Sequence, residues 1–161
     1  MDRKIKLLFV DDETRFLETL AKRLSLRDFD VTAATSAEEA ISALESGKFE
    51  IALVDLKMPG MGGERLLELI AKRYPEMETI VLTGHGTIDS AVECTRNGAY
   101  RYLQKPCETE ALLSTLSGAY QSYLGRKMRL DEQKMASILD SAGGASPLSI
   151  LRRLRELSGD E

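Results

Sequence analysis

Five short apolar segments, each followed by a helical pattern, constrain the fold of this chain most strongly. The apolar segments are residues 5–10, 29–33, 51–54, 79–83 and 99–103, and the helical patterns follow at about 16–24, 36–44, 64–73, 88–97 and 108–123. Strands that alternate with helices form parallel sheets, because each crossover needs a helix that packs back on the sheet. We therefore predict an α/β domain, a doubly wound five-stranded parallel sheet with helices on both faces.

Two helix ends carry recognisable signals. Ser36 is followed three residues later by Glu39, the pattern of a capping box, and predicts a helix that begins after Ser36. The Asn97-Gly98 pair is typical of the end of a helix, because glycine adopts the left-handed conformation without strain. These signals support the predicted alternation.

Acidic residues follow two of the predicted strands. Asp55 comes directly after the apolar run 51–54, and Asp11 and Asp12 follow the run 5–10. Open α/β sheets bind ligands beyond the carboxyl ends of their strands, so these carboxylates converge at one edge. Three carboxylates repel one another unless a hard cation lies among them, which predicts a site for Mg²⁺ or another divalent cation such as Mn²⁺. The alternative is that Asp11 and Asp12 only start the next helix, where acids suit the dipole.

Two further strands end in polar residues, and the whole pattern resembles a known family. Thr83 ends the fourth strand, and Lys105-Pro106 follows the fifth. Two local motifs accompany these residues, Asp55-x-x-Met58-Pro59-Gly60 and Thr83-Gly84-His85-Gly86. The order and spacing of the residues at the strand ends, together with these motifs, resemble those of the receiver domains of two-component response regulators. The resemblance covers residues 4–124, and the run 82–106 looks especially like receivers of the nitrogen-regulator type. It implies a flavodoxin-like, chemotaxis-regulator-like fold with strand order 2-1-3-4-5.

The resemblance implies a chemistry for these residues. Asp55 would accept a phosphoryl group from a sensor histidine kinase, with Asp11, Asp12, Asp55 and the backbone carbonyl of Lys57 as metal ligands. Lys105 and the Thr83 hydroxyl would contact phosphoryl oxygens, with help from the Gly84 N–H, and a lysine ammonium suits this role as a compact point charge. The output would be a change in protein–protein contacts.

The resemblance also implies a switch. Thr83 would move toward the phosphoryl group and Tyr102 would turn inward, which would reshape the face of the fourth helix, fifth strand and fifth helix for an output protein. The alternative is that Tyr102 packs at the sheet edge with its hydroxyl in water. Lys57 and His85 occupy positions that modulate hydrolysis of the phosphoaspartate in receivers, or simply point into solvent.

The last part of the chain is less informative. We assign residues 1–124 to the receiver and 125–161 to a helical tail or linker. Gly125 ends the fifth helix, or the helix runs on through residues 126–139. After Gly143-Gly144, Ser146-Pro147 resembles a helix start. A stripe of Leu148, Leu151, Leu154 and Leu157 then predicts a short amphipathic helix that packs on the receiver, pairs with a second copy or binds another protein.

Composition excludes other classes. No run approaches the roughly 20 apolar residues of a membrane span, and the start of the chain lacks an apolar signal segment. Cys94 and Cys107 have no metal-ligand spacing, so we expect reduced thiols in a cytoplasmic protein. Cys107 departs from the Phe that receivers often carry there. A net charge of −4 argues against direct nucleic-acid binding.

Two other classes remain open. A doubly wound phosphohydrolase would turn over a phosphate ester through Asp55, but such enzymes usually place a second acid just after the nucleophile, where Leu56 and Lys57 stand. A phosphorylation-independent interaction module would keep the fold without using the acidic pocket. We expect a receiver that performs phosphoryl chemistry on itself and is not an enzyme with a separate substrate.

Overall fold

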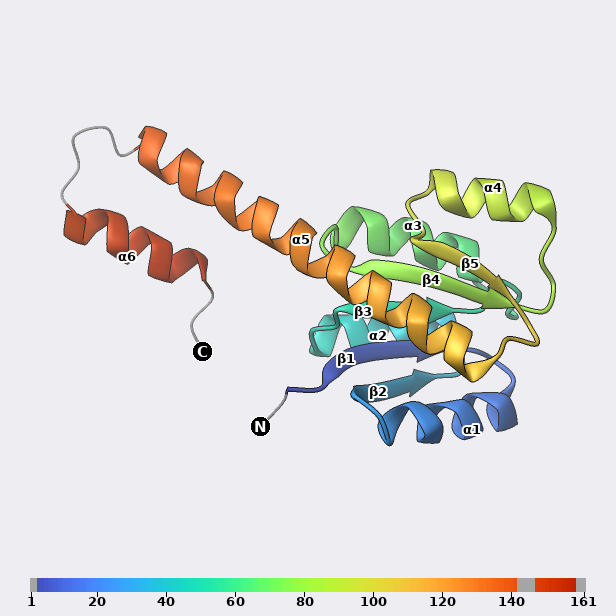
Figure 1. Ribbon diagram of the computed structural model, residues 1–161. Helices are drawn as coiled ribbons and strands as arrows, with labels where there is room; N and C mark the ends of the chain where they lie inside the picture. Colours follow the sequence, from blue (N-terminus) through green and yellow to red (C-terminus); the bar gives the residue numbers. More distant parts are fainter. Residues whose placement is uncertain (1–2, 142–146, 159–161) are drawn as a thin grey trace. The chain divides into compact units, whose positions relative to one another are not determined.

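The chain forms a five-stranded parallel sheet with helices around it (Figure 1). The computed structural model describes residues 3–141 and 147–158. The strands are β1 Ile5–Val10, β2 Phe29–Ala34, β3 Ile51–Val54, β4 Glu78–Thr83 and β5 Arg101–Gln104. Their order in the sheet is β2-β1-β3-β4-β5, and each neighbouring pair is parallel. The predicted fold class and strand order are confirmed.

Helices cover both faces of this sheet because successive strand residues point to opposite sides. The helices of the chain are α1 Thr14–Ser25, α2 Ala37–Ser46, α3 Gly63–Arg73, α4 Ile88–Arg96, α5 Thr109–Ser141 and α6 Pro147–Leu157. Residues of α1 to α5 contribute to the core on the two faces. Leu7 and Phe9 of β1 are buried in a core cluster with residues of α1 and α5. Leu8 and Val10 are buried in a second cluster with residues of α2 and α3. This stretch of β1 is therefore apolar on both faces of the sheet, and its acidic residues follow at the end of the strand.

The helix-end signals have the predicted effect, with one difference. The Ser36 hydroxyl accepts a hydrogen bond from the Glu39 N–H at 3.1 Å, as expected for a capping box. The Glu39 carboxylate, however, accepts from the Thr35 N–H at 2.8 Å, one residue before the cap. This hydrogen bond holds the pKa of Glu39 below its usual value. At the end of α4, Asn97 is the cap and Gly98 has a φ of 96°.

The fifth strand begins later than predicted. Ala99 still belongs to the end of α4, because its N–H donates to the Cys94 carbonyl at 3.0 Å. Pairing with β4 starts with the Tyr100 N–H, which donates to the Thr79 carbonyl at 2.7 Å. The strand proper starts at Arg101. The hydrogen bond at the end of α4 thus includes Ala99, which hydrophobic periodicity assigned to β5.

The chain divides into two compact units, Met1–Tyr123 and Leu124–Glu161. The helix α5 continues through Gly125 to Ser141, so the second of the two predicted alternatives is correct. A glycine inside a helix costs only about 1 kcal/mol relative to alanine, which a helix of this length tolerates. The predicted amphipathic helix is present as α6, while Gly143, Gly144 and Ser146 lie outside the described residues.

Along residues 3–141 and 147–158, no helix combines the length and apolar character needed to cross a membrane.

Candidate functional site

Three carboxylates lie together at the carboxyl edge of the sheet. Asp11 and Asp12 follow β1, and Asp55 follows β3, the neighbouring strand. Each offers one oxygen, and these oxygens lie within 4.8 Å of one another. Asp11 and Asp55 are fully buried, whereas Asp12 is exposed. The structure thus brings together the three acids that the sequence predicted.

Backbone contacts fix the position of Asp55. Its N–H donates to the Val10 carbonyl at 2.9 Å, which continues the pairing of β3 with β1. On the other side, the Gly63 N–H donates to the Leu56 carbonyl at 2.9 Å. A Cβ on Gly63 would overlap the Asp55 carbonyl oxygen and lie 2.8 Å from Leu56 Cα. The start of α3 therefore packs directly on the backbone that carries Asp55.

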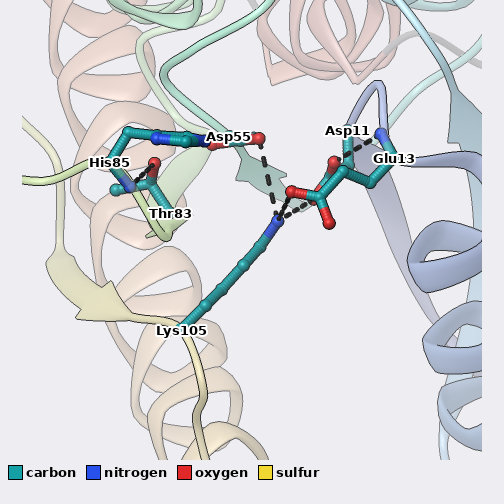
Figure 2. A network of polar contacts seen from close by, with 6 residues as sticks. All are labelled: Asp11, Glu13, Asp55, Thr83, His85 and Lys105. Carbon is teal, nitrogen blue, oxygen red and sulfur yellow. Dashed lines mark hydrogen bonds and ion pairs between the residues drawn. The ribbon is translucent and has the colours of Figure 1, made fainter.

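Lys105 reaches into the acidic cluster from the end of β5. Figure 2 shows its side chain extended between Asp55 on one side and Asp11 with Glu13 on the other. Its Nζ lies 2.7 Å from Asp11 Oδ2, 3.3 Å from Glu13 Oε1 and 3.7 Å from Asp55 Oδ2. Only 12% of the side chain is exposed. Lys105 is therefore not a solvated surface charge, as a single lysine before a proline would ordinarily be. The Lys105-Pro106 peptide bond is cis.

Burial is the largest single influence on the pKa values of Asp11 and Lys105, but it decides the direction of the shift only for Asp11. It raises the pKa of the Asp11 carboxyl above its usual value, although the hydrogen bond from Lys105 acts in the opposite direction. Burial also disfavours the charged form of Lys105, but the hydrogen bond and charge of Asp11, with the charges of Asp55 and Glu13, raise its pKa above the usual value. The Lys105 amine is therefore protonated at neutral pH, and this one ammonium lies beside the carboxylates of Asp11, Glu13 and Asp55.

Asp55 has unused capacity to bind a cation. Within the described residues, neither of its buried side-chain oxygens accepts a hydrogen bond. A buried carboxylate normally has such partners, so a cation ligand would satisfy these atoms. The all-oxygen donor set of Asp11, Asp12 and Asp55 suits a hard divalent cation, and the exposed Asp12 leaves access from solvent. The residues present thus fit the predicted metal.

Asp11 also has a local role. Its Oδ1 accepts a hydrogen bond from the Glu13 N–H at 2.9 Å, just before α1 begins. This hydrogen bond orders the backbone before α1, but α1 has neither a side-chain cap nor an acid in its first turn. Starting the next helix also does not account for Asp11 Oδ2, which accepts a hydrogen bond from Lys105.

The predicted residues at the end of β4 and in the loop after it lie at the same edge. Thr83 is fully buried, and its hydroxyl accepts a hydrogen bond from the His85 N–H at 3.2 Å. His85 and Lys57 are both exposed and line one hollow of about 340 Å³ beside this loop. Gly84 is exposed and has room around its Cα. A Cβ at this position would meet Lys105 Cβ first, at an ordinary contact distance of 3.8 Å.

Tyr102 is tied to the loop that follows Thr83. Its hydroxyl lies 3.1 Å from Ser90 Oγ on α4, and it packs so closely on Gly86 that a Cβ there would overlap it. Ser90 also forms a capping box with Thr87 at the start of α4. The tyrosine is half-buried at the edge of the core.

Sequence reasoning missed four contributors to this site. Glu13 binds Lys105, Gly63 packs on Asp55, and Ser90 meets Tyr102. Phe16 places its ring beneath the Lys105 ammonium, with 4.2 Å between Nζ and the ring centroid. Glu13 alone had a signal, since it directly extends the acidic pair.

Comparison with known proteins identifies the family. Residues 7–117 match the family model described as the response regulator receiver domain. The chain therefore belongs to the receiver domain family of response regulators.

Individual relatives agree with this assignment. The response regulator protein FleR of Pseudomonas aeruginosa is 40% identical over 112 residues, which cover 70% of this chain and 24% of FleR. The DNA-binding transcriptional regulator NtrC of Proteus hauseri is 29% identical over 146 residues, 90% of this chain and 31% of NtrC. The chain spans about a quarter to a third of the length of these relatives.

A solved structure agrees as well. The CheY-like receiver domain protein of Methanospirillum hungatei superposes with a TM-score of 0.73 at 30% identity, and the match covers 76% of this chain and 98% of that one.

Proposed function

We propose that Asp55 accepts a phosphoryl group from the phosphohistidine of a sensor histidine kinase. The observation that carries this is a buried carboxylate without hydrogen-bond partners in the described structure, beside a cation and two further acids. An Asp55 oxygen would form the new O–P bond while the N–P bond of the donor breaks. The electron pair of that bond would return to the imidazole, which leaves as a neutral base after protonation.

Asp11, Asp12, Asp55 and the backbone carbonyl of Lys57 are the proposed ligands of Mg²⁺, for which Mn²⁺ is a substitute. When bound, the ion would neutralise charge on the phosphoryl oxygens and bring the donor close to Asp55. The fold buries Asp11 and Asp55 away from solvent and keeps their carboxylates close together. Lys105 already offsets part of their repulsion before any metal binds.

Lys105 and Thr83 are the proposed contacts of the phosphoryl oxygens. The Lys105 Nζ lies 3.7 Å from Asp55 Oδ2, so a small movement brings it to a group attached there. The Thr83 hydroxyl would donate to another oxygen, and the Gly84 N–H would assist. Lys57 and His85 line one hollow together with Leu56, the residue after the acceptor, and are the proposed modulators of phosphoaspartate hydrolysis.

The proposed output is a change at the surface of α4, β5 and the receiver part of α5. Movement of Thr83 would be transmitted through the Gly86 loop to Tyr102, whose hydroxyl meets Ser90 on α4. Ile88 and Val92 of α4 are 85% and 48% exposed and give this surface an apolar patch. The partners would be the sensor kinase, an output protein on this surface and a second copy of the chain.

Family membership supports this function over the two alternatives. Relatives of the matched family are regulators, which favours a receiver that is phosphorylated on itself over a phosphohydrolase with a separate substrate. The cluster of buried acids and Lys105 favours a working phosphoryl site over a module that keeps only the fold.

Intact mass after incubation with acetyl phosphate and Mg²⁺ tests the proposal. The native protein should gain about 80 Da, one phosphoryl group, and the gain should disappear with a chelator or in Asp55→Asn. Asp89→Asn, an exposed acid of α4, is the control and should keep the adduct.

Two results would contradict the proposal. One is a native protein that gains no mass under rapid quenching. The other is sustained turnover of unrelated phosphate esters, which would favour the phosphohydrolase.

A further inference from the structure

The Lys105 ammonium lies on the face of an aromatic ring. Its Nζ is 4.2 Å from the centroid of Phe16, a half-buried residue in the first turn of α1. A cation within about 6 Å of a ring centroid is attracted by the negative face of the ring. Phe16 therefore provides Lys105 with a contact that carries no charge and needs no hydrogen bond.

The ring itself is held in place. Phe9 of β1 is buried and meets Phe16 edge to face, with centroids 6.1 Å apart and an interplanar angle of 82°. This is a favourable arrangement for two aromatic rings. Phe9 belongs to β1, an interior strand that also leads into Asp11, so the Phe16 ring packs on the same strand that positions the acidic cluster.

The ring differs from the other contacts of Lys105 in one respect. Asp11 and Asp55 are the same carboxylates that would bind the metal, and Asp55 would also carry the phosphoryl group. Their attraction for Lys105 must therefore weaken or change direction during the reaction. The attraction between the Phe16 ring and Lys105 does not change in this way, because the ring binds neither the metal nor the phosphoryl group.

We propose that Phe16 is a positioning residue for Lys105, which keeps the ammonium in reach of the phosphoryl oxygens while its carboxylate partners are engaged elsewhere. The inference rests on the proposed function of Asp55. A lysine side chain loses considerable rotamer freedom when it is fixed, so a pre-formed contact favours the reactive arrangement. The measured strengths of such contacts correspond to roughly 2- to 30-fold in rate.

Two kinds of variant separate this role from simple packing. Phe16→Leu removes the ring. Phe29→Leu makes the same change at a buried position of the core cluster on which Phe16 packs, where no cation lies over the ring among the described residues. Site-specific replacement of Phe16 by mono-, di- and trifluorinated phenylalanine keeps the shape of the ring and lowers the negative potential of its face stepwise. Only the attraction for Lys105 should follow that series.

The first readout needs no phosphorylation. In proton NMR spectra of the full chain, the Lys105 ε-methylene should be shifted upfield by the Phe16 ring, and Phe16→Leu should abolish the shift. A native spectrum without the upfield shift would overturn the contact itself, whether or not Asp55 is phosphorylated.

The second readout is the rate of phosphorylation by acetyl phosphate at saturating Mg²⁺, followed by quenched intact mass. Phe16→Leu should lower it by roughly 2- to 30-fold, and the fluorinated series should lower it progressively, while Phe29→Leu keeps the native rate. Thermal unfolding of each variant shows whether it is folded. Native rates throughout the fluorinated series would overturn the proposal, whereas an unphosphorylated native protein would instead refute the function proposed for Asp55.

Discussion

Replacing Gly63 by alanine tests how the start of α3 holds the acceptor aspartate. A Cβ at this position would overlap the Asp55 carbonyl oxygen and lie 2.8 Å from Leu56 Cα. Carbon atoms in contact are normally about 3.5–4.0 Å apart, so the two backbones must separate by about 1 Å. Neither backbone can yield by a rotamer change, because both belong to the main chain.

The expected loss of stability follows from three contributions. Overpacking of this kind costs about 1–3 kcal/mol, and the hydrogen bond from the Gly63 N–H to the Leu56 carbonyl contributes about 0.5–1.5 kcal/mol if it breaks. The lower entropy of the unfolded chain offsets about 0.4–1 kcal/mol. We therefore expect Gly63→Ala to reduce the free energy of unfolding by about 2 kcal/mol, or roughly 8 °C in Tm.

The neighbouring glycine is a matched control. A Cβ on Gly62 would lie 3.5 Å from the Leu56 carbonyl oxygen, an ordinary contact, and the residue has an extended conformation with a ψ of 165°. Gly62→Ala should change the free energy of unfolding by less than about 0.5 kcal/mol.

Urea unfolding and the phosphorylation rate together measure the effect. A displacement of about 1 Å at a reacting group can slow a reaction about 100-fold, so Gly63→Ala should also be phosphorylated far more slowly than Gly62→Ala. If both variants matched the native protein in unfolding midpoint and rate, the close packing of α3 on Asp55 would not have the importance that we assign to it.

Three further predictions concern the rest of the first unit. Ser36→Ala should lower the free energy of unfolding by about 1 kcal/mol in denaturant titrations, because the Glu39 N–H loses its cap; an unchanged midpoint would contradict this. Burial raises the pKa of the Cys94 thiol, so less thiolate forms at neutral pH, and iodoacetamide should modify it at least about tenfold faster after unfolding. Tyr102→Ala should keep phosphorylation but lose the phosphorylation-dependent NMR shifts of α4; retention of those shifts would exclude the proposed switch.

Local patterns determined the elements and the acidic end of the sheet. The buried run 51–54 could only be a central strand, and Asp55 follows it directly, so its place at the carboxyl edge needed no further information. Strand boundaries were less accurate where two structures compete for one residue, as for Ala99 between α4 and β5. Gly125 was ambiguous because a glycine penalty of about 1 kcal/mol does not decide where a long helix ends.

The sequence by itself therefore determined which strands exist, their parallel arrangement and which polar residues share one edge, because hydrophobic periodicity and the position of a residue at a strand end are local properties. Only the tertiary structure decided how Lys105 divides its contacts among Asp11, Glu13 and Asp55, and that the ring of Phe16 lies beneath it. The physical reason is that these contacts join residues between 50 and 94 positions apart in the chain, and their distances depend on packing and rotamers that no local pattern encodes.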